Sequence, residues 1–270
     1  MNTPQRPHDQ RFRLDGRDAL ITGGGGHLGS AMSAALAEAG ARVFVNSRSA
    51  ERAAATVEKI QASGGQATAA VFDITDAAAV KLWFAEAAPA ELHVLINNAY
   101  AGGAGSIKTA QPEAFADSYD ITVVAAQRLL LNAQPALAAA AAAGTGASVI
   151  NIATMYAVVS PDPSNYDSPA TMNPPFYGAA KAALLQWTRH AACELGGSGI
   201  RVNALSPGPF PNPTVQQSNP GFVRTLAART PLGRIGLPDE IQGPLLFLAC
   251  DASTYVTGTN LMVDGGWTSW

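Results

Sequence analysis

The chain has 270 residues, of which 47% are hydrophobic and 14% charged, and its formal net charge is −3. This composition supports a large core, and a small net charge without blocks of like sign argues against a nucleic-acid or membrane surface. The start of the chain is polar, no apolar run reaches membrane-spanning length, and the four histidines lack metal-ligand spacing. We therefore expect a cytoplasmic protein without a bound metal. Cys193 and Cys250 lie in Ala/Leu-rich stretches and are expected to be buried and reduced.

The first elements predict a unit that binds a dinucleotide. Residues 1–13 are polar, contain two prolines and are expected to form a flexible arm. A short apolar strand at 18–22 then runs into the glycine-rich turn Gly23–Gly29, an Ala-rich helix follows to Ala39, and 42–46 is the next strand. Glycines let the backbone approach a pyrophosphate, and a helix N-terminus offers unpaired N–H groups and the positive end of a dipole.

The alternation of helix and strand continues to the end of the chain. The strands are short and apolar without alternation, which is typical of parallel strands covered on both faces. We predict the α/β class: a Rossmann-type, doubly wound parallel sheet of about seven strands with helices on both faces, in a single domain over residues 14–270. The expected helices are 50–62, 77–87, 112–143 (broken or bent at Pro135), 176–195 and 239–248, and the further strands are 67–72, 92–97, 148–154, 201–206 and 261–263.

Polar, glycine or proline residues gather where the predicted strands end. Ligands of such sheets bind outside the carboxyl ends of the strands, so this edge is the expected site. Polar loops alone explain the regularity poorly, because the residues recur at one strand end after another. They are Gly23–Gly29, Ser47-Arg48, Asp73-Ile74, Asn97-Asn98-Ala99, Thr154 and Ser206-Pro207-Gly208.

Tyr177 and Lys181 are spaced for proton transfer. Residues four apart on a helix lie on one face, one turn above the other. A phenol has a pKa near 10, and a nearby ammonium group favours the phenolate and lowers that value. Thr154, at the end of the preceding strand, could hold a substrate oxygen while the proton moves. Taken alone, the pair is also compatible with a solvated lysine lying over a half-buried tyrosine.

These motifs in this order resemble those of the short-chain dehydrogenase/reductase family in its compact single-domain form. The resemblance implies hydride transfer between C4 of a nicotinamide dinucleotide and a carbonyl or alcohol carbon, and it suggests a homo-oligomer, a tetramer or a dimer. The match runs from about Leu14 to Trp267. Its landmarks are Thr22-Gly23 to Gly29, Asp73, Asn97-Asn98-Ala99, Tyr177-x-x-x-Lys181, Arg201-Val202-Asn203, Pro207-Gly208, Val256-Thr257-Gly258 and Val263-Asp264-Gly265-Gly266.

The resemblance also implies roles for single residues. Tyr177 would be the acid/base, Lys181 would hold the ribose hydroxyls and lower the pKa of Tyr177, and Thr154 stands where the family usually has Ser. Asp73 and Ile74 would flank the adenine. The expected cofactor-binding residues are Gly23, Gly25, Gly26, His27, Leu28, Gly29, Ser47, Arg48, Asp73, Ile74, Asn98, Ala99, Tyr177, Lys181, Pro207, Gly208 and Phe210.

The end of the second strand predicts the choice of cofactor. A carboxylate there would accept hydrogen bonds from a ribose 2′-hydroxyl and repel a 2′-phosphate. This chain instead has Asn46-Ser47-Arg48. Ser47 can donate to a phosphate and Arg48 can pair with it, so we expect NADP(H) to be preferred, with NAD(H) possible. The alternative is that Arg48 only begins the next helix in solvent.

The chain departs from the family at several positions. His27 stands where the glycine turn usually has Gly, and Asn97-Asn98-Ala99 is followed by Tyr100 where Gly is usual. The Asn that usually kinks the long helix and holds a proton-relay water corresponds to Thr122, which we include among the expected catalytic residues. Asn212 stands in the loop where a Thr often contacts the carboxamide.

Two segments are expected to cover the substrate. Residues 155–175 form a Pro-stiffened insert between Thr154 and Tyr177, and residues 209–231 are rich in Pro and Asn and expected to be mobile. A surface excursion or a subunit contact is the alternative for the insert. Hydroxyls, amides and rings in these regions suit a sugar- or polyol-like molecule. The expected substrate-facing residues are Tyr100, Tyr156, Asn165, Tyr166 and Asn173.

The sequence thus predicts an NADP(H)-dependent oxidoreductase that acts on an alcohol or ketone carbon of a small polar substrate. Two alternatives stay open. Changes at His27, Tyr100 and Thr122 would fit a catalytically impaired dinucleotide-binding sensor or structural protein. Gly26 and the insert would fit an epimerase or dehydratase that recycles its cofactor.

Overall fold

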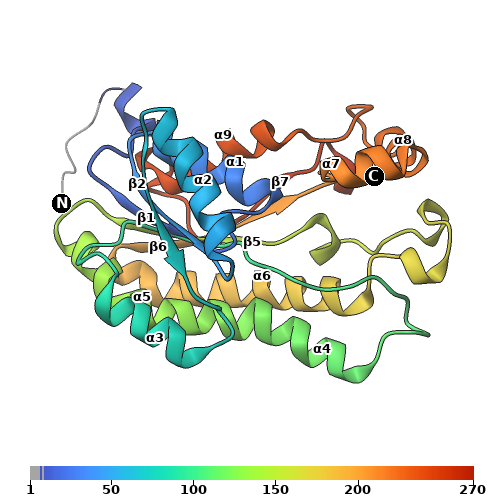
Figure 1. The fold of residues 1–270 in the computed structure, drawn as a ribbon, viewed down its shortest axis with the longest axis horizontal. Coiled ribbons are helices and arrows are strands. Elements are labelled where there is room, and N and C mark those ends of the chain that lie inside the picture. Colours follow the sequence, from blue (N-terminus) through green and yellow to red (C-terminus); the bar gives the residue numbers. More distant parts are fainter. Residues whose placement is uncertain (1–6, 8) are drawn as a thin grey trace.

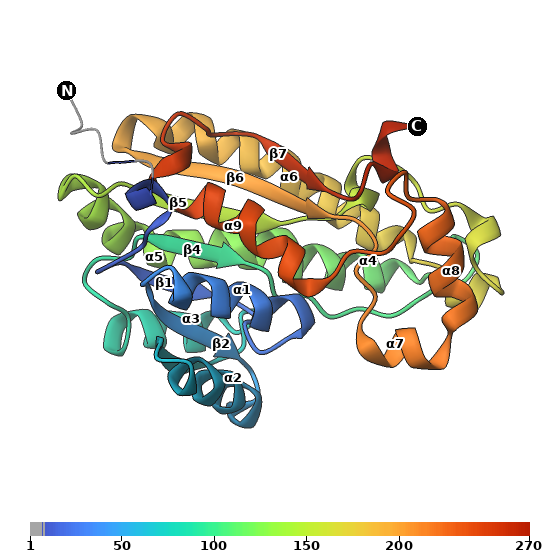
Figure 2. The same cartoon turned by 90° about the horizontal axis from the view of Figure 1, so that it is seen from above.

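The computed structural model describes residue 7 and residues 9–270 of the chain. In this part a seven-stranded parallel sheet runs through the centre in the strand order β3-β2-β1-β4-β5-β6-β7 (Figures 1 and 2). The order reverses between β1 and β4, as in a doubly wound fold. The strands are β1 Asp18–Ile21, β2 Arg42–Ser47, β3 Gln66–Val71, β4 Val94–Asn97, β5 Ala147–Ile152, β6 Ile200–Pro207 and β7 Asn260–Val263.

Helices cover both faces of the sheet, which confirms the predicted fold class. In Figure 1, α1, α2 and α9 lie above the sheet and α3, α5 and α6 lie below it. Each layer buries its own apolar cluster, one centred on α1 and α9 and the other on α5 and α6. The helices are α1 His27–Glu38, α2 Ala50–Ala62, α3 Ala77–Glu86, α4 Pro112–Tyr119, α5 Ala125–Ala142, α6 Pro175–Leu195, α7 Pro213–Ser218, α8 Pro220–Ala228 and α9 Gln242–Ala249.

The central strands are buried at every residue, which explains their uninterrupted apolar sequences. All residues of β4 and β5 are buried. Leu95 of β4 lies between Leu20 of β1 and Val149 of β5 in a register that brings the carboxyl ends of these strands to one edge. No helix within the described residues is long and apolar enough to cross a membrane.

The predicted long helix at 112–143 is interrupted, but not at Pro135. That proline lies inside α5, which runs to Ala142. The interruption is a π-helical turn at Asp120–Val124, between α4 and α5. The expected break at Pro135 does not occur, and the alternative, a bend at that residue, stays a prediction. The irregular turn lies upstream, where the extra residue of the π turn lets the chain change direction.

Three further regions differ from the expected pattern. The segment 209–231, expected to be mobile, contains α7 and α8, and the insert 155–175 contains three short 3-10 turns. Most of the predicted arm (residues 1–6 and 8) lies outside the described residues, and Asp9–Phe12 forms a 3-10 turn. Cys250 is buried as expected, but Cys193 on α6 is exposed.

Candidate active site

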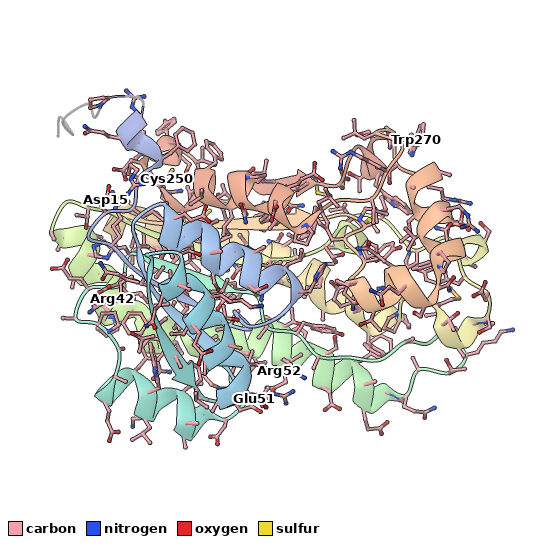
Figure 3. The ribbon with its side chains drawn as sticks, turned by 45° about the horizontal axis from the view of Figure 1, so that its top comes forward. Asp15, Arg42, Glu51, Arg52, Cys250 and Trp270 are labelled. Atoms are coloured by element: carbon pink, nitrogen blue, oxygen red, sulfur yellow. The ribbon has the colours of Figure 1, made fainter. Side chains whose placement is uncertain are left out.

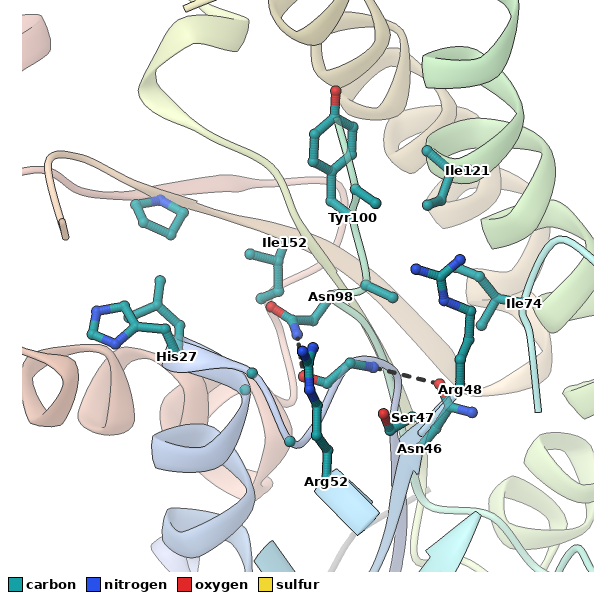
Figure 4. Close-up of a pocket in the computed structure, with 18 of the residues that line it drawn as sticks. His27, Asn46, Ser47, Arg48, Arg52, Ile74, Asn98, Tyr100, Ile121 and Ile152 are labelled. Carbon is teal, nitrogen blue, oxygen red and sulfur yellow. Dashed lines mark hydrogen bonds between the residues drawn. The ribbon is translucent and has the colours of Figure 1, made fainter. Parts of the chain in front are cut away.

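A cavity of about 730 Å³ lies at the carboxyl ends of the strands (Figure 4). It extends from the glycine turn past the end of β2 to the start of α6. Every residue expected to bind the cofactor lines it, together with Thr154 and Tyr100. The lining residues that the sequence did not single out are Asn46, Ser49, Arg52, Phe72, Ala101, Ile121, Ile152 and Ala153.

The glycine turn leaves no room for side chains. A Cβ at Gly29 would lie 2.1 Å from the carbonyl oxygen of Gly23, and one at Gly25 would lie 2.9 Å from the carbonyl oxygen of Arg52. The following helix α1 has no side-chain cap at its N-terminus. Its first N–H groups therefore lack a side-chain acceptor, and the turn has the shape and the donors that fit a pyrophosphate.

The loop after β4 is fastened to the end of β1. The hydroxyl of Thr22 accepts hydrogen bonds from the backbone N–H groups of Asn98 (2.9 Å) and Ala99 (3.1 Å). The side-chain amide of Asn98 donates back to the carbonyls of Thr22 and Gly23. These hydrogen bonds hold the backbone of the loop in one position, so the next residue, Tyr100, also has a fixed backbone position.

Arg48 and Arg52 lie at the end of the cavity where the sequence predicts that the adenosine binds. In Figure 4 the guanidinium groups of Arg48 and Arg52 both point up on either side of Ser47. Arg48 pairs with Asp73 at 3.5 Å and keeps a side chain that is 67% exposed. Arg52 was missed by sequence reasoning, because it lies in the first turn of α2 and Arg48 precedes that helix.

Buried Asn46 supports this corner from below. Its side-chain amide donates to the carbonyls of Ala70 and Phe72 at 3.0 Å, and its oxygen accepts a long hydrogen bond from the N–H of Gly23. The end of β2 is thereby tied to β3 and to the glycine turn. No carboxylate on β2 itself faces a ribose, since Asn46 and Ser47 occupy its last two positions.

The expected catalytic side chains meet at the other end of the cavity. Tyr177 lies in the first turn of α6, Lys181 one turn later, and Thr154 follows β5. Lys181 is buried, and its ammonium group donates to the carbonyl of Ile152 at 2.6 Å. Burial lowers the pKa of Lys181 to about 8.

Burial has the larger effect on Tyr177 as well. It raises the pKa of the Tyr177 phenol to about 12, although a hydrogen bond with Thr154 acts in the opposite direction. This shift is opposite to the lowering expected from the Tyr-x-x-x-Lys spacing. The reason is that the lysine is itself buried and points to the Ile152 carbonyl, with its nitrogen 6.0 Å from the centre of the Tyr177 ring.

Thr122 lies in the π turn, is buried, and its hydroxyl has no hydrogen-bond partner among the described residues. It does not line the cavity.

Of the expected substrate-facing residues, only Tyr100 lines the cavity. The hydroxyls of Tyr156 and Tyr166 bond each other at 3.0 Å, and the amide of buried Asn165 is likewise without a partner in this part of the chain, as is the side-chain oxygen of Asn173.

The two segments expected to cover the substrate are fastened to each other. Arg229, just after α8, pairs with Asp162 and donates to Ser164 at 2.7 Å. The rings of Tyr166 and Phe222 pack with centroids 5.5 Å apart. Contacts of this kind make residues 155–175 and the helix α8 one structural unit beside the catalytic end of the cavity.

Comparison with known proteins identifies the family. The family model described as enoyl-(acyl carrier protein) reductase matches residues 26–268. The chain is 35% identical over 264 residues to galactitol 2-dehydrogenase (L-tagatose-forming) of Cereibacter sphaeroides, covering 96% of this chain and 98% of that protein. It is 34% identical over 276 residues to galactitol 2-dehydrogenase of Rhizobium johnstonii, with 97% and 99% covered.

Solved structures give the same result. The Pseudomonas aeruginosa RhlG/NADP active-site complex superposes with a TM-score of 0.86 at 31% identity, covering 96% of this chain and 98% of that one. A gluconate 5-dehydrogenase from Burkholderia cenocepacia in complex with NADP and tartrate has a TM-score of 0.84 at 30% identity, covering 97% and 100%. The chain therefore belongs to the short-chain dehydrogenase/reductase family and is an oxidoreductase that acts on alcohol groups.

Proposed function

We propose that this enzyme uses NADP(H) to interconvert an alcohol and a ketone on a small sugar- or polyol-like substrate. The observation that carries the proposal is one continuous cavity that joins an uncapped glycine turn to the Thr154, Tyr177 and Lys181 side chains. The bound dinucleotide would supply or take up the hydride. The residues of the chain provide binding, orientation and the accompanying proton, with residues 14–270 acting as one unit.

Each side chain has a defined task in this proposal. The phenol of Tyr177 gives a proton to the substrate oxygen during reduction and takes it back during oxidation. The hydroxyl of Thr154, which already bonds Tyr177, holds that oxygen in reach. Lys181 holds the ribose and keeps a positive charge beside the phenol, and the free hydroxyl of buried Thr122 offers a site for a relay water.

A preference for NADP(H) follows from charge. Arg48 and Arg52 present two guanidinium groups beside Ser47, and guanidinium groups suit phosphate oxygens. Asp73 is the nearby carboxylate, and its pairing with Arg48 reduces its repulsion of a 2′-phosphate. Two of the similar solved structures are NADP complexes, which supports the same preference.

A polar substrate is supported by three of the similar proteins and by polar groups of the insert. Galactitol and gluconate dehydrogenases are among the similar proteins. The hydroxyls of Tyr156 and Tyr166 and the unpartnered amide of Asn165 lie in the insert that packs on α8. We also infer a homo-oligomer, a dimer or a tetramer, in which exposed Trp270 is a suitable anchor.

The test is a panel of hexitols, aldonates and matching ketoses with NADP⁺ or NADPH, followed by absorbance of the reduced nicotinamide. We expect turnover with at least one polyol or ketose, and its loss in Tyr177→Phe with cofactor binding retained. Turnover confined to steroids or acyl thioesters would contradict the substrate class. Isomerisation of a sugar without net change in nicotinamide absorbance would instead indicate an epimerase that recycles its cofactor.

A further inference from the structure

The side chain of Tyr100 lies against both members of the catalytic pair. Its ring meets the ring of Tyr177 edge-to-face, with centroids 4.8 Å apart and an interplanar angle of 60°. The nitrogen of Lys181 lies 5.5 Å from the centre of the Tyr100 ring, closer than to the ring of Tyr177. The distances from the Lys181 nitrogen to the ring centres, 5.5 Å for Tyr100 and 6.0 Å for Tyr177, lie within the range in which an aromatic face attracts a cation.

The phenol of Tyr100 is anchored to the start of α6. Its oxygen lies 3.1 Å from the hydroxyl of buried Ser118 on α4, and Ser118 donates to the carbonyl of Phe176 at 3.1 Å. Phe176 is the residue immediately before Tyr177. One chain of hydrogen bonds therefore joins Tyr100 to the turn of helix that carries the phenol.

The backbone around Tyr100 is adapted to this side chain. A Cβ at Gly102 would lie 2.5 Å from the phenol oxygen of Tyr100, so a larger residue there would displace that oxygen from its place beside Ser118. The hydrogen bonds of Asn98 and Ala99 to Thr22 fix the loop from the other side. The ring thus stands on a rigid base and has a defined neighbour at each end.

A neighbouring aromatic face stabilises the ammonium group of Lys181, which has few other stabilising contacts. Its hydrogen-bond acceptor is the carbonyl of Ile152, and no ion pair of Lys181 occurs among the described residues. The groups packed around it are Tyr177 on its own helix, Tyr100 from the loop after β4 and the β5 carbonyl. Burial is the cause that lowers its pKa, and no charged group adds to it.

We propose that Tyr100 is a positioning residue of this enzyme: its ring stabilises the ammonium form of Lys181 and sets the orientation of Tyr177, and its phenol anchors that arrangement through Ser118. The proposal deepens the proposed function and rests on it for the meaning of the pair. The family usually has Gly at the position of Tyr100, and a glycine has no ring that could contact Lys181 and Tyr177.

The test separates the ring from the hydroxyl. Tyr100→Phe keeps the aromatic face and removes the anchor, whereas Tyr100→Leu keeps bulk and removes the face. The chain has four lysines, at positions 59, 81, 108 and 181. ¹³C-lysine NMR of the cofactor-free protein, with Lys181→Arg to assign the signal, therefore reports the pKa of Lys181 directly.

We expect Tyr100→Leu to lower the pKa of Lys181 by about 0.4 to 1.5 units, the range of a cation–π contact expressed as a pKa shift. Tyr100→Phe should stay within about 0.2 units of the wild type. Tyr100→Phe and Ser118→Ala should each lower kcat about 2- to 12-fold with the Kd of the dinucleotide unchanged, as the loss of one hydrogen bond predicts.

Equal pKa values for Lys181 in the wild type and in Tyr100→Leu would overturn the proposal, and so would an equal shift in the Phe and Leu variants. If Tyr100→Leu does not fold, Tyr100→Met, which also lacks an aromatic face, serves in its place. The NMR measurement needs no substrate. A lack of turnover with every polyol would therefore contradict the proposed function while leaving the result on Tyr100 and Lys181 intact.

Discussion

Replacing the two arginines beside Ser47 one at a time tests the cofactor preference. The Arg48 side chain is 67% exposed and its pairing with Asp73 at 3.5 Å is long, so that ion pair competes weakly. A charge-assisted hydrogen bond from such an exposed side chain to a phosphate is worth about 1 to 2 kcal/mol after allowing for solvent. We expect Arg48→Ala to raise the Kd for NADPH about 5- to 30-fold, and Arg52→Ala to do the same, with the Kd for NADH changed less than about two-fold.

The assay is titration of each variant with NADPH and NADH, followed by nicotinamide fluorescence at low and high salt. The matched control is Arg189→Ala, because Arg189 is exposed on α6, donates to its neighbour Gln186 and does not line the cavity. The NADPH effect should shrink as salt screens the guanidinium groups. Equal losses for both cofactors in Arg48→Ala, or a wild type that binds NADH more tightly, would refute the reasoning.

Three further outcomes follow from the contacts. Tyr177→Phe should lower kcat by about 10²- to 10⁴-fold in steady-state assays with an unchanged Kd for the dinucleotide, and a loss below tenfold would exclude the phenol as the proton donor. Gly29→Ala should lower Tm and abolish dinucleotide binding in calorimetry, whereas Gly243→Ala, with open space around its Cβ, should leave both unchanged; equal Tm values would contradict the clash. Arg229→Ala should raise KM for the substrate about 2- to 5-fold by freeing Asp162, with cofactor Kd constant; unchanged KM would show that this contact does not hold the segments over the substrate.

The fold could be predicted because its signals are local and repeated. Each buried strand is a short apolar run, as in Val94–Asn97, and each is separated from the next by a helix. Parallel strands connected in this way bring their carboxyl ends to one edge of the sheet. Residues at the strand ends could therefore be assigned to one site from the sequence alone. Arg52 escaped notice because it lies inside a helix and not at a strand end.

The helices α7 and α8 were not predicted, because proline occurs both in mobile segments and at the first position of helices. The prolines of the segment 209–231 were interpreted as a sign of mobility, but Pro213 and Pro220 are each the first residue of a helix, where a proline loses no hydrogen bond. Asn212 and Asn219 cap these helices by accepting from the N–H groups of Val215 and Phe222. Asn followed by Pro was the signal for two helix starts.

The π turn could not be predicted in the same way. Asp120–Val124 adds one residue to a helix whose apolar pattern otherwise continues, and a pattern with a period near 3.6 residues does not reveal a single insertion. Its position follows from packing against α6, which the local sequence does not contain. The turn places Thr122 in the interior, where its hydroxyl lacks a partner.

The pKa of Tyr177 departs most clearly from the expectation drawn from its spacing to Lys181, and the reason is general. Spacing on a helix predicts that two side chains are near each other, but a pKa also depends on how far both are removed from water. Here burial raises the pKa of Tyr177 and lowers that of Lys181, so it shifts each group toward its neutral form. The contacts that favour the charged forms differ between the two groups. The carbonyl of Ile152 and the ring of Tyr100 favour the ammonium form of Lys181, and the hydroxyl of Thr154 favours the phenolate of Tyr177.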